Sequence, residues 1–140
     1  MRIIELTTDE DILHARDVMR QLRPSIAEDA YLATVRRMME AGYRQVALFD
    51  DGQARAVAGF RIFEMLYTGG PALYVDDLNT DERVRSRGHG RALLEWLKNE
   101  ARAKGCTQMH LDSGVQPESA HSFYFREGLG VICFHFRVAI

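Results

Sequence analysis

The sequence has little cysteine, little proline and no long apolar run. Its two cysteines, Cys106 and Cys133, do not make a disulfide framework, so we expect a reducing, cytoplasmic environment. No apolar stretch approaches the roughly 20 residues of a membrane-spanning helix. The first residues, Met1–Glu5, lack the apolar core of a signal peptide. These features predict a protein that does not act in a membrane.

An excess of charge of one sign is also missing. Lysine and arginine number 18 against 20 acidic residues, which gives a net charge of −2. A chain with this balance has no overall positive field to attract nucleic acid. The composition, 46% hydrophobic and 27% charged, is typical of globular rather than disordered proteins. The length of 140 residues fits one compact domain over residues 1–140.

Apolar periodicity and turn signals predict the element order β-α-α-β-β-β-α-β-α-β. The chain should begin with a strand over Arg2–Leu6. Thr7 and Glu10 have the spacing of a capping box and predict the start of a helix. Ser25 and Glu28 repeat that spacing before a second helix.

The second part of the chain should begin with three antiparallel strands. Tyr43–Phe49 and Ala54–Leu66 flank an Asp51-Gly52 turn. A mixed, mostly antiparallel sheet with helices on both faces follows, an α/β fold with one parallel crossover. The other elements are strands over Ala72–Thr80, Thr107–Ser113 and Val131–Val138, a helix over Gly90–Lys104, and a helix that begins at Pro117 and ends at Gly128.

One glycine-rich stretch lies between a strand and a helix: Arg85-Ser86-Arg87-Gly88-His89-Gly90-Arg91. Its two glycines let an anion approach the main chain, and the first N–H groups of a helix have no intrahelical partners. The helix dipole adds about half a positive charge at that end, and the arginines, with Arg83 before them, add more. The predicted ligand is a phosphate or pyrophosphate. The local pattern alone fits a turn with solvated arginines equally well.

Two nucleotide-binding motifs fit this stretch poorly. The ATP-binding loop needs Gly-Lys-Ser/Thr, where this sequence has Gly90-Arg91-Ala92. The dinucleotide motif needs a third glycine, where Leu93 stands. Asp112 does occupy the position of a ribose-binding acid, so a nucleotide-binding oxidoreductase stays an alternative. The antiparallel strands before the loop and the single βαβ unit count against it.

Here the chain resembles the GNAT superfamily of acetyltransferases. Arg85-x-x-Gly88-x-Gly90 is similar to the coenzyme A loop of that family, Arg/Gln-x-x-Gly-x-Gly/Ala. Asp76–Asp81 resembles its central strand, and Ala120–Gly128 resembles its Ala-x-x-Phe-Tyr-x-x-x-Gly segment. The element order agrees over nearly the whole chain. The sequence departs from the family at Pro117, where Asn is frequent, and at Leu129, where Phe is usual.

The resemblance implies an enzyme that moves acetyl from acetyl-CoA to a primary amine by direct attack in a ternary complex. The acceptor would be a small molecule or a peptide, and no metal is implied. Loop N–H groups would hold the pyrophosphate, and the pantetheine would pair with the central strand where the sheet splays. An N–H near Leu78 or Asn79 would stabilise the oxyanion. The implied coenzyme-binding residues are Leu78, Asn79, Thr80, Arg85, Ser86, Arg87, Gly88, His89, Gly90, Arg91 and Arg126.

Tyr124 is the residue that the resemblance assigns as acid for the departing thiolate. A phenol with a pKa of about 10 stays protonated at neutral pH, although a lone Tyr124 would be read as a half-buried helix aromatic. For the base we prefer Asp77 over Asp76 and Glu64. Side chains alternate between the two faces of a strand, so Asp76 and Asp77 should lie on opposite faces of the sheet unless a bulge intervenes. Asp77 could instead bind the substrate as a counter-charge while water removes the proton.

Several further expectations concern the acceptor and the partners. Asp76, Asp77 and Glu64 would form an acidic floor that attracts a primary ammonium. The resemblance implies that Tyr31 and the Arg36-Arg37 pair touch the substrate, because the first two helices usually line the acceptor site in this fold, although we favour solvated helix charges. His110-x-Asp112 lacks a third ligand, so we expect no metal site. A non-catalytic acetyl-CoA sensor stays an alternative, as does a homodimer.

Overall fold

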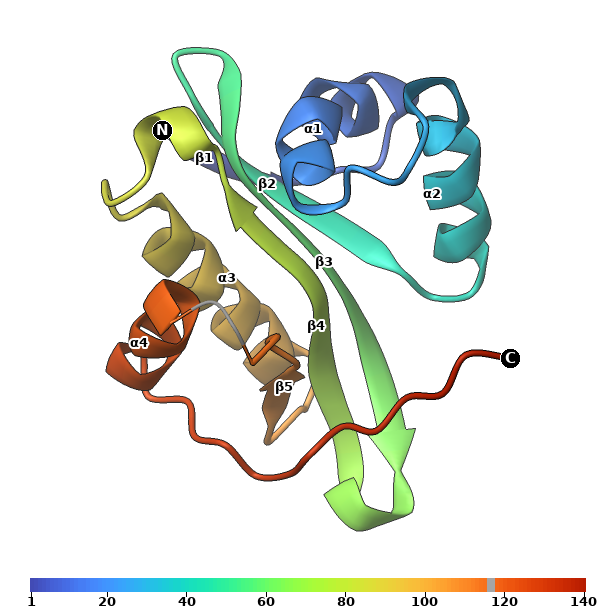
Figure 1. Cartoon of the computed structure of the whole chain (residues 1–140), viewed down its shortest axis with the longest axis vertical. Coiled ribbons are helices and arrows are strands. Elements are labelled where there is room, and N and C mark those ends of the chain that lie inside the picture. The colour runs from blue at the N-terminus through green and yellow to red at the C-terminus, as the bar shows by residue number, and fades with distance from the viewer. Residues whose placement is uncertain (116–117) are drawn as a thin grey trace. The chain divides into compact units, whose positions relative to one another are not determined.

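The computed structural model describes residues 1–115 and 118–140 (Figure 1). It forms two compact units, Met1–His110 and Leu111–Ile140, and each is described by itself. The element order is β-α-α-β-β-β-α-β-α. The five strands make one sheet in the order β1-β2-β3-β4-β5. The mixed, mostly antiparallel α/β class expected from the sequence is therefore confirmed.

The first four strands form an antiparallel meander in which each strand pairs with the next. Asp51 and Gly52 connect β2 to β3 with φ angles of 51° and 71°, which is the left-handed geometry of a tight hairpin turn. The strand β5 completes the sheet beside β4. The bounds are β1 (Arg2–Glu5), β2 (Arg44–Asp50), β3 (Gln53–Met65), β4 (Gly70–Thr80) and β5 (Met109–Leu111).

The two helices after β1 begin at positions other than those expected. The N-cap of α1 (Asp9–Leu22) is Thr8 rather than Thr7, and its hydroxyl accepts from the N–H of Asp11 at 3.1 Å. A 3-10 turn over Glu28–Ala30 precedes α2 (Tyr31–Glu40). No side chain caps α2, so the prediction of a cap at Ser25 is wrong. Tertiary packing of an apolar face, more than a cap, defines such a helix.

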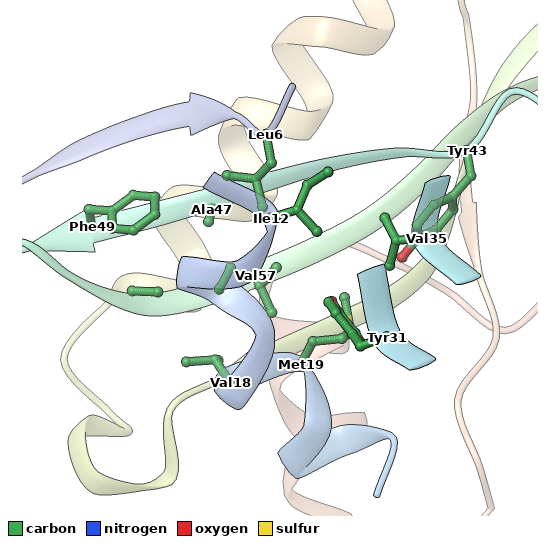
Figure 2. Close-up of a cluster of buried hydrophobic side chains, with 12 residues drawn as sticks. Leu6, Ile12, Val18, Met19, Tyr31, Val35, Tyr43, Ala47, Phe49 and Val57 are labelled. Atoms are coloured by element: carbon green, nitrogen blue, oxygen red, sulfur yellow. The ribbon is translucent and has the colours of Figure 1, made fainter. Parts of the chain in front are cut away.

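Side chains on α1 and α2 bury one face of the sheet. Figure 2 shows Ile12, Val18 and Met19 of α1 facing Val57 of β3, and these four are all at most 3% exposed. Full burial of such a side chain contributes about 1.5–3 kcal/mol. The helix α3 (His89–Ala103) covers the other face, where the ring of Trp96 packs edge-on against Phe60 at 5.9 Å. The sheet therefore has helices on both faces, as expected.

The unit Leu111–Ile140 contains α4 (Glu118–Arg126). Gly128 closes this helix with a φ of 90° and an N–H that donates to Phe125. Pro117, expected in its first turn, lies outside the described residues.

Residues 129–140 adopt neither helix nor strand, so the prediction of a strand over Val131–Val138 is wrong. A high β propensity does not suffice, since a strand needs a neighbour that pairs with its main chain. Within the described part of this unit, no second strand of matching length is available. No helix in the described ranges is long and apolar enough to span a membrane.

Candidate functional site

The strand β4 contains a β-bulge at Asp76. Gly59 of β3 lies opposite Asp77, whereas the next residue, Phe60, lies opposite Val75. Asp76 is therefore an extra residue, and an extra residue reverses the alternation of faces beyond it. Asp76 and Asp77 consequently lie on the same face, toward α1 and α2. Regular alternation would place the two residues on opposite faces, and this bulge is the exception that the sequence analysis allowed for.

Asp77 accepts hydrogen bonds from two side chains that are far away in sequence. The hydroxyl of Tyr43 donates to Oδ2 at 2.8 Å, and Nε of Arg23 donates to Oδ1 at 2.8 Å. The side chain of Asp77 is 12% exposed and that of Arg23 is 47% exposed. Burial, together with the charge of Asp77, raises the pKa of Tyr43 far above its usual value. Tyr43 therefore stays a proton donor to Asp77.

Gly59 makes the space that Tyr43 needs. A Cβ atom at Gly59 would overlap the hydroxyl and ring of Tyr43. The amide of Gln45 donates to the hydroxyls of Tyr43 and Tyr31 at 3.3 and 3.2 Å. Figure 2 shows Tyr43 together with Tyr31 and Val35, which belong to α2. These buried contacts hold the phenol of Tyr43 in one position.

A cavity of about 190 Å³ opens beside this group. It is smaller than the roughly 300–1,000 Å³ typical of sites for drug-sized ligands. Its wall is mainly apolar, and its charged end consists of Arg23 and Asp77. The residues that line it are Met19, Arg23, Ile26, Tyr31, Thr34, Val35, Met38, Tyr43 and Asp77.

The acidic floor expected from the sequence is neutralised. Asp76 binds the guanidinium of Arg61 at 2.7 Å, and Asp77 binds Arg23. Glu64 is exposed and lies opposite Pro71. It is five residues along β3 from Gly59, about 17 Å at strand spacing. Each carboxylate near the cavity therefore has an arginine, and Glu64 does not belong to the group.

The hydrogen-bond register shows which main-chain groups of β4 face outward. The N–H of Asp81 donates to Arg55 of β3 at 2.8 Å, so by alternation the N–H groups of Leu78 and Thr80 point away from β3. The strand β5 reaches β4 at Leu73, whose N–H donates to Gln108. Within Met1–His110, the outer edge of Leu78–Thr80 therefore has no strand partner.

Asn79 differs from its two neighbours. By the same alternation its N–H faces β3, and its side-chain amide donates to the carbonyl of Val18 at 2.8 Å. Asn79 is only 8% exposed, so its side chain connects β4 to α1. Of the two residues expected near an oxyanion, Leu78 has the N–H on the outer edge.

Asp81 organises the chain where β4 ends, a role that the sequence analysis missed. Its fully buried carboxylate accepts from Arg83 at 2.9 Å, from Gln21 at 3.2 Å and from Arg55 at 3.4 Å. The hydrogen bond from Arg83 is the main cause that lowers the pKa of Asp81. Arg83 therefore has Asp81 as its partner, although its side chain is 68% exposed. The sequence signal for this role of Asp81 was an aspartate directly before a turn, where it caps Glu82–Val84.

The glycine loop leads directly into α3. Gly88 caps the helix with a φ of 83°, and Ser86 has a φ of 67°. The first helical hydrogen bond runs from Ala92 N–H to the carbonyl of Gly88, so the N–H groups of His89 and Gly90 precede it. The exposed side chains here are Arg85, Ser86, Arg87 and Arg91.

The side chain of His89 is an exception among the loop residues. It is 6% exposed, and its Nε2 lies 4.0 Å from Oδ2 of Asp50 at the end of β2. Only the main chain of His89 can therefore contribute to an anion site at the loop.

Tyr124 and Arg126 lie on α4, in the unit Leu111–Ile140. Both contact Phe123: the ring of Tyr124 packs edge-on at 5.5 Å, and the guanidinium of Arg126 lies 5.8 Å from the ring centroid. Burial raises the pKa of Tyr124, which keeps the phenol protonated at neutral pH.

His110 and Asp112, which share a short motif, have different partners. His110 contacts Gln108 at 2.7 Å, whereas Asp112 contacts His135 at 2.6 Å. Across residues 1–115 and 118–140, no three His, Cys, Asp or Glu side chains are placed to hold a metal ion.

Comparison with known proteins gives concordant matches. Residues 5–130 match the model of the Acetyltransferase (GNAT) family. The "Uncharacterized N-acetyltransferase YhdJ" of Bacillus subtilis (strain 168) is 30% identical over 121 residues, 86% of this chain and 84% of that protein.

Two solved structures illustrate the likeness of fold. The aminoglycoside N-acetyltransferase AAC(6')-Iy, in complex with CoA, superposes with a TM-score of 0.80 at 21% identity over 98% of this chain and 95% of that one. A ribosomal-protein-alanine N-acetyltransferase from Brucella melitensis biovar Abortus 2308 gives a TM-score of 0.84 at 16% identity, with 100% of both chains covered.

Proposed function

Because this chain belongs to the Acetyltransferase (GNAT) family and is an acetyl-CoA-dependent N-acetyltransferase, we propose that its acceptor is a primary amine bound beside Asp77. Attack would be direct, in a ternary complex. The observation that carries the proposal is the position of Asp77 at the charged end of a small cavity. The next residue on the same strand, Leu78, turns its N–H to the outer edge.

The chain offers main-chain groups that fit the coenzyme. Acetyl-CoA supplies an acyl group activated as a thioester. The outer edge of Leu78–Thr80 would pair with the amides of the pantetheine arm, as an added strand does. The N–H groups of His89 and Gly90, at the positive end of α3, would hold the pyrophosphate. Arg85, Arg87 and Arg91 would add charge around it, and Arg126 would contact the coenzyme from α4.

Three residues would carry the chemistry. Asp77 would take a proton from the bound ammonium, so that the amine nitrogen can form a C–N bond with the thioester carbon. The N–H of Leu78 would donate to the carbonyl oxygen as that oxygen gains negative charge. Tyr124 would give its proton to sulfur as the C–S bond breaks. The nitrogen, which carries a second excess proton after the attack, would lose it and so restore the phenol of Tyr124, and the products would be an N-acetyl amine and the free thiol.

A thiol-release assay tests this function directly. The full-length protein is incubated with acetyl-CoA and a panel of primary amines, and free thiol and acetylated product are both quantified. We expect equal amounts of thiol and N-acetyl product with at least one primary amine, and none with the matching alcohol. A protein that binds acetyl-CoA but releases no thiol with any amine would instead be a sensor of acetyl-CoA.

A further inference from the structure

An ion pair closes the charged end of the cavity. Arg23 follows the last residue of α1, and its guanidinium donates to Oδ1 of Asp77 at 2.8 Å and to the carbonyl of Asp76 at 3.1 Å. Arg23 is about half exposed, whereas Asp77 is nearly buried. An acceptor ammonium that reaches Asp77 must therefore share this carboxylate with Arg23 or displace Arg23 from it.

The charges around the cavity favour a ligand with no net charge. Two carboxylates, Asp76 and Asp77, face two guanidiniums, those of Arg61 and Arg23. A simple ammonium that displaced Arg23 would leave the guanidinium without its carboxylate partner, and a polycation would also be repelled by Arg23. A zwitterion inserted into the pair gives both groups a new partner, ammonium to Asp77 and carboxylate to Arg23. Arginine binds carboxylates especially well because its planar fork can bind both oxygens.

The remaining wall of the cavity is suited to an apolar side chain. Four of the residues that line it, Met19, Ile26, Val35 and Met38, have apolar side chains. The hydroxyl of Tyr31 is bound to Gln45. The volume of about 190 Å³ is small for a ligand site, so a bulky acceptor such as an oligosaccharide does not fit inside it.

We infer that the acceptor is a free α-amino acid with a small aliphatic side chain, bound as a zwitterion between Asp77 and Arg23. This inference rests on the proposed function, because it names the acceptor class of the same site. A peptide N-terminus is a poorer fit, because its first residue carries an amide where Arg23 needs a carboxylate. Arg23 is therefore the residue that determines specificity, and Asp77 is the residue that receives the amine.

Three acceptors with one side chain test the inference. Leucine carries the carboxylate, leucinamide replaces it by a neutral amide, and 3-methylbutylamine lacks it. The specificity constant kcat/KM is measured for each at saturating acetyl-CoA and expressed per protonated amine, the form that Asp77 binds in this proposal. Calorimetric titration of leucine and leucinamide into the protein with CoA gives binding that does not depend on turnover.

We expect leucine to exceed leucinamide and 3-methylbutylamine by about tenfold or more, because the latter two leave a polar group of the site unpaired. Arg23→Gln should abolish this preference, and Arg23→Lys should retain part of it because the charge remains. Arg102→Gln is the matched control, since Arg102 is an exposed arginine of α3 outside the cavity lining. That variant should keep the full preference.

Two results would overturn the inference while leaving acetyl transfer intact. One is equal kcat/KM and equal affinity for leucine and leucinamide in the wild-type protein. The other is an undiminished preference for leucine in Arg23→Gln. Absence of thiol release with every amine, leucine included, would overturn the proposed function itself and the acceptor class with it.

Discussion

The phenol of Tyr43 donates a 2.8 Å hydrogen bond to the carboxylate of Asp77. Asp77 belongs to β4, whereas Tyr43 directly precedes β2, and the two residues are separated by 34 positions. Their contact passes through the space above Gly59, which any side chain at that position would fill. The orientation of Asp77 toward the cavity therefore depends on a buried donor as well as on the bulge in its own strand.

Tyr43→Phe should reduce acceptor use without changing coenzyme binding. The variant keeps the ring and removes one hydrogen bond to a charged group, which is worth about 1.5–3 kcal/mol. We expect kcat/KM for the acceptor to fall by roughly tenfold to a hundredfold, with an unchanged dissociation constant for acetyl-CoA. Tyr74→Phe is the control, because Tyr74 lies on the same strand as Asp77 but outside the cavity lining. Equal losses in both variants would make the hydroxyl of Tyr43 a packing group only.

Asp81→Asn should destabilise the protein in a pH-dependent way. The folded-state pKa of Asp81 is lowered by Arg83, so its stabilisation is fully present above the unfolded value of about 3.9 and is lost as pH falls below it. At pH 7 the variant should lose about 1–3 kcal/mol of unfolding free energy. At pH about 3 the difference from wild type should be smaller.

Urea unfolding at the two pH values measures this difference. Glu82→Gln serves as the control, because Glu82 is an exposed neighbour and should change stability little at either pH. A loss in Asp81→Asn that is the same at both pH values would show that the ionised form of Asp81 is not what stabilises the end of β4.

Gly90→Val should prevent coenzyme binding without unfolding the protein. Gly90 lies in the first turn of α3, where a β-branched side chain would block access to the main chain. In wild type, acetyl-CoA at a hundred times its dissociation constant should add about 2.7 kcal/mol to the unfolding free energy. In Gly90→Val this gain should vanish. Ala92→Val, on the same helix, controls for helix propensity, and normal CoA binding by Gly90→Val would contradict the loop assignment.

Tyr124→Phe should slow the chemical step. General acids typically contribute about a hundred- to ten-thousandfold, and the raised pKa of Tyr124 keeps its proton in place over the mildly alkaline range. Single-turnover rates are the measurement, so that product release does not mask the effect. Acetyl-CoA affinity should be unchanged. Tyr67→Phe, at an exposed tyrosine, should keep the wild-type rate, and a wild-type rate in Tyr124→Phe would show that Tyr124 only packs.

Periodicity and turn chemistry predicted most of the fold because they are local. The Asp51-Gly52 turn has the two positive φ angles that its residues favour. The helix expected at Gly90 begins one residue earlier, at His89. By contrast, the final strand was predicted from its content of β-branched and aromatic residues. That content carries no information on whether a neighbouring strand is available for pairing.

The candidate site was harder to predict, because its contacts are long-range. Asp77 was identified from a motif, but Arg23 and Tyr43 reach it over 54 and 34 positions, and no local pattern indicates such pairs. The bulge at Asp76 changes the face of every later residue in β4, and a single inserted residue leaves the apolar pattern almost unchanged. The neutral charge of the cavity follows from these contacts and was therefore missed.

Asp77→Asn should show whether this carboxylate removes the proton of the acceptor. Amines are mostly protonated at neutral pH, with reference pKa values of about 7.7–8.0 for an α-amine and about 10.4 for a lysine-like amine. Wild-type activity should therefore rise with pH through the mildly alkaline range. At pH about 6.5 few amines arrive unprotonated, so the loss in Asp77→Asn should be largest there and shrink as pH rises.

Asp76→Asn is the matched control for that profile. Asp76 is the adjacent carboxylate on the same face, but it binds Arg61 rather than a group at the cavity. Its variant should give a profile parallel to that of wild type. Because Asp77 also anchors the ammonium, a uniform loss at every pH would indicate binding alone. An Asp77→Asn protein as active as wild type at pH about 6.5 would mean that water carries the proton away and that the carboxylate is structural.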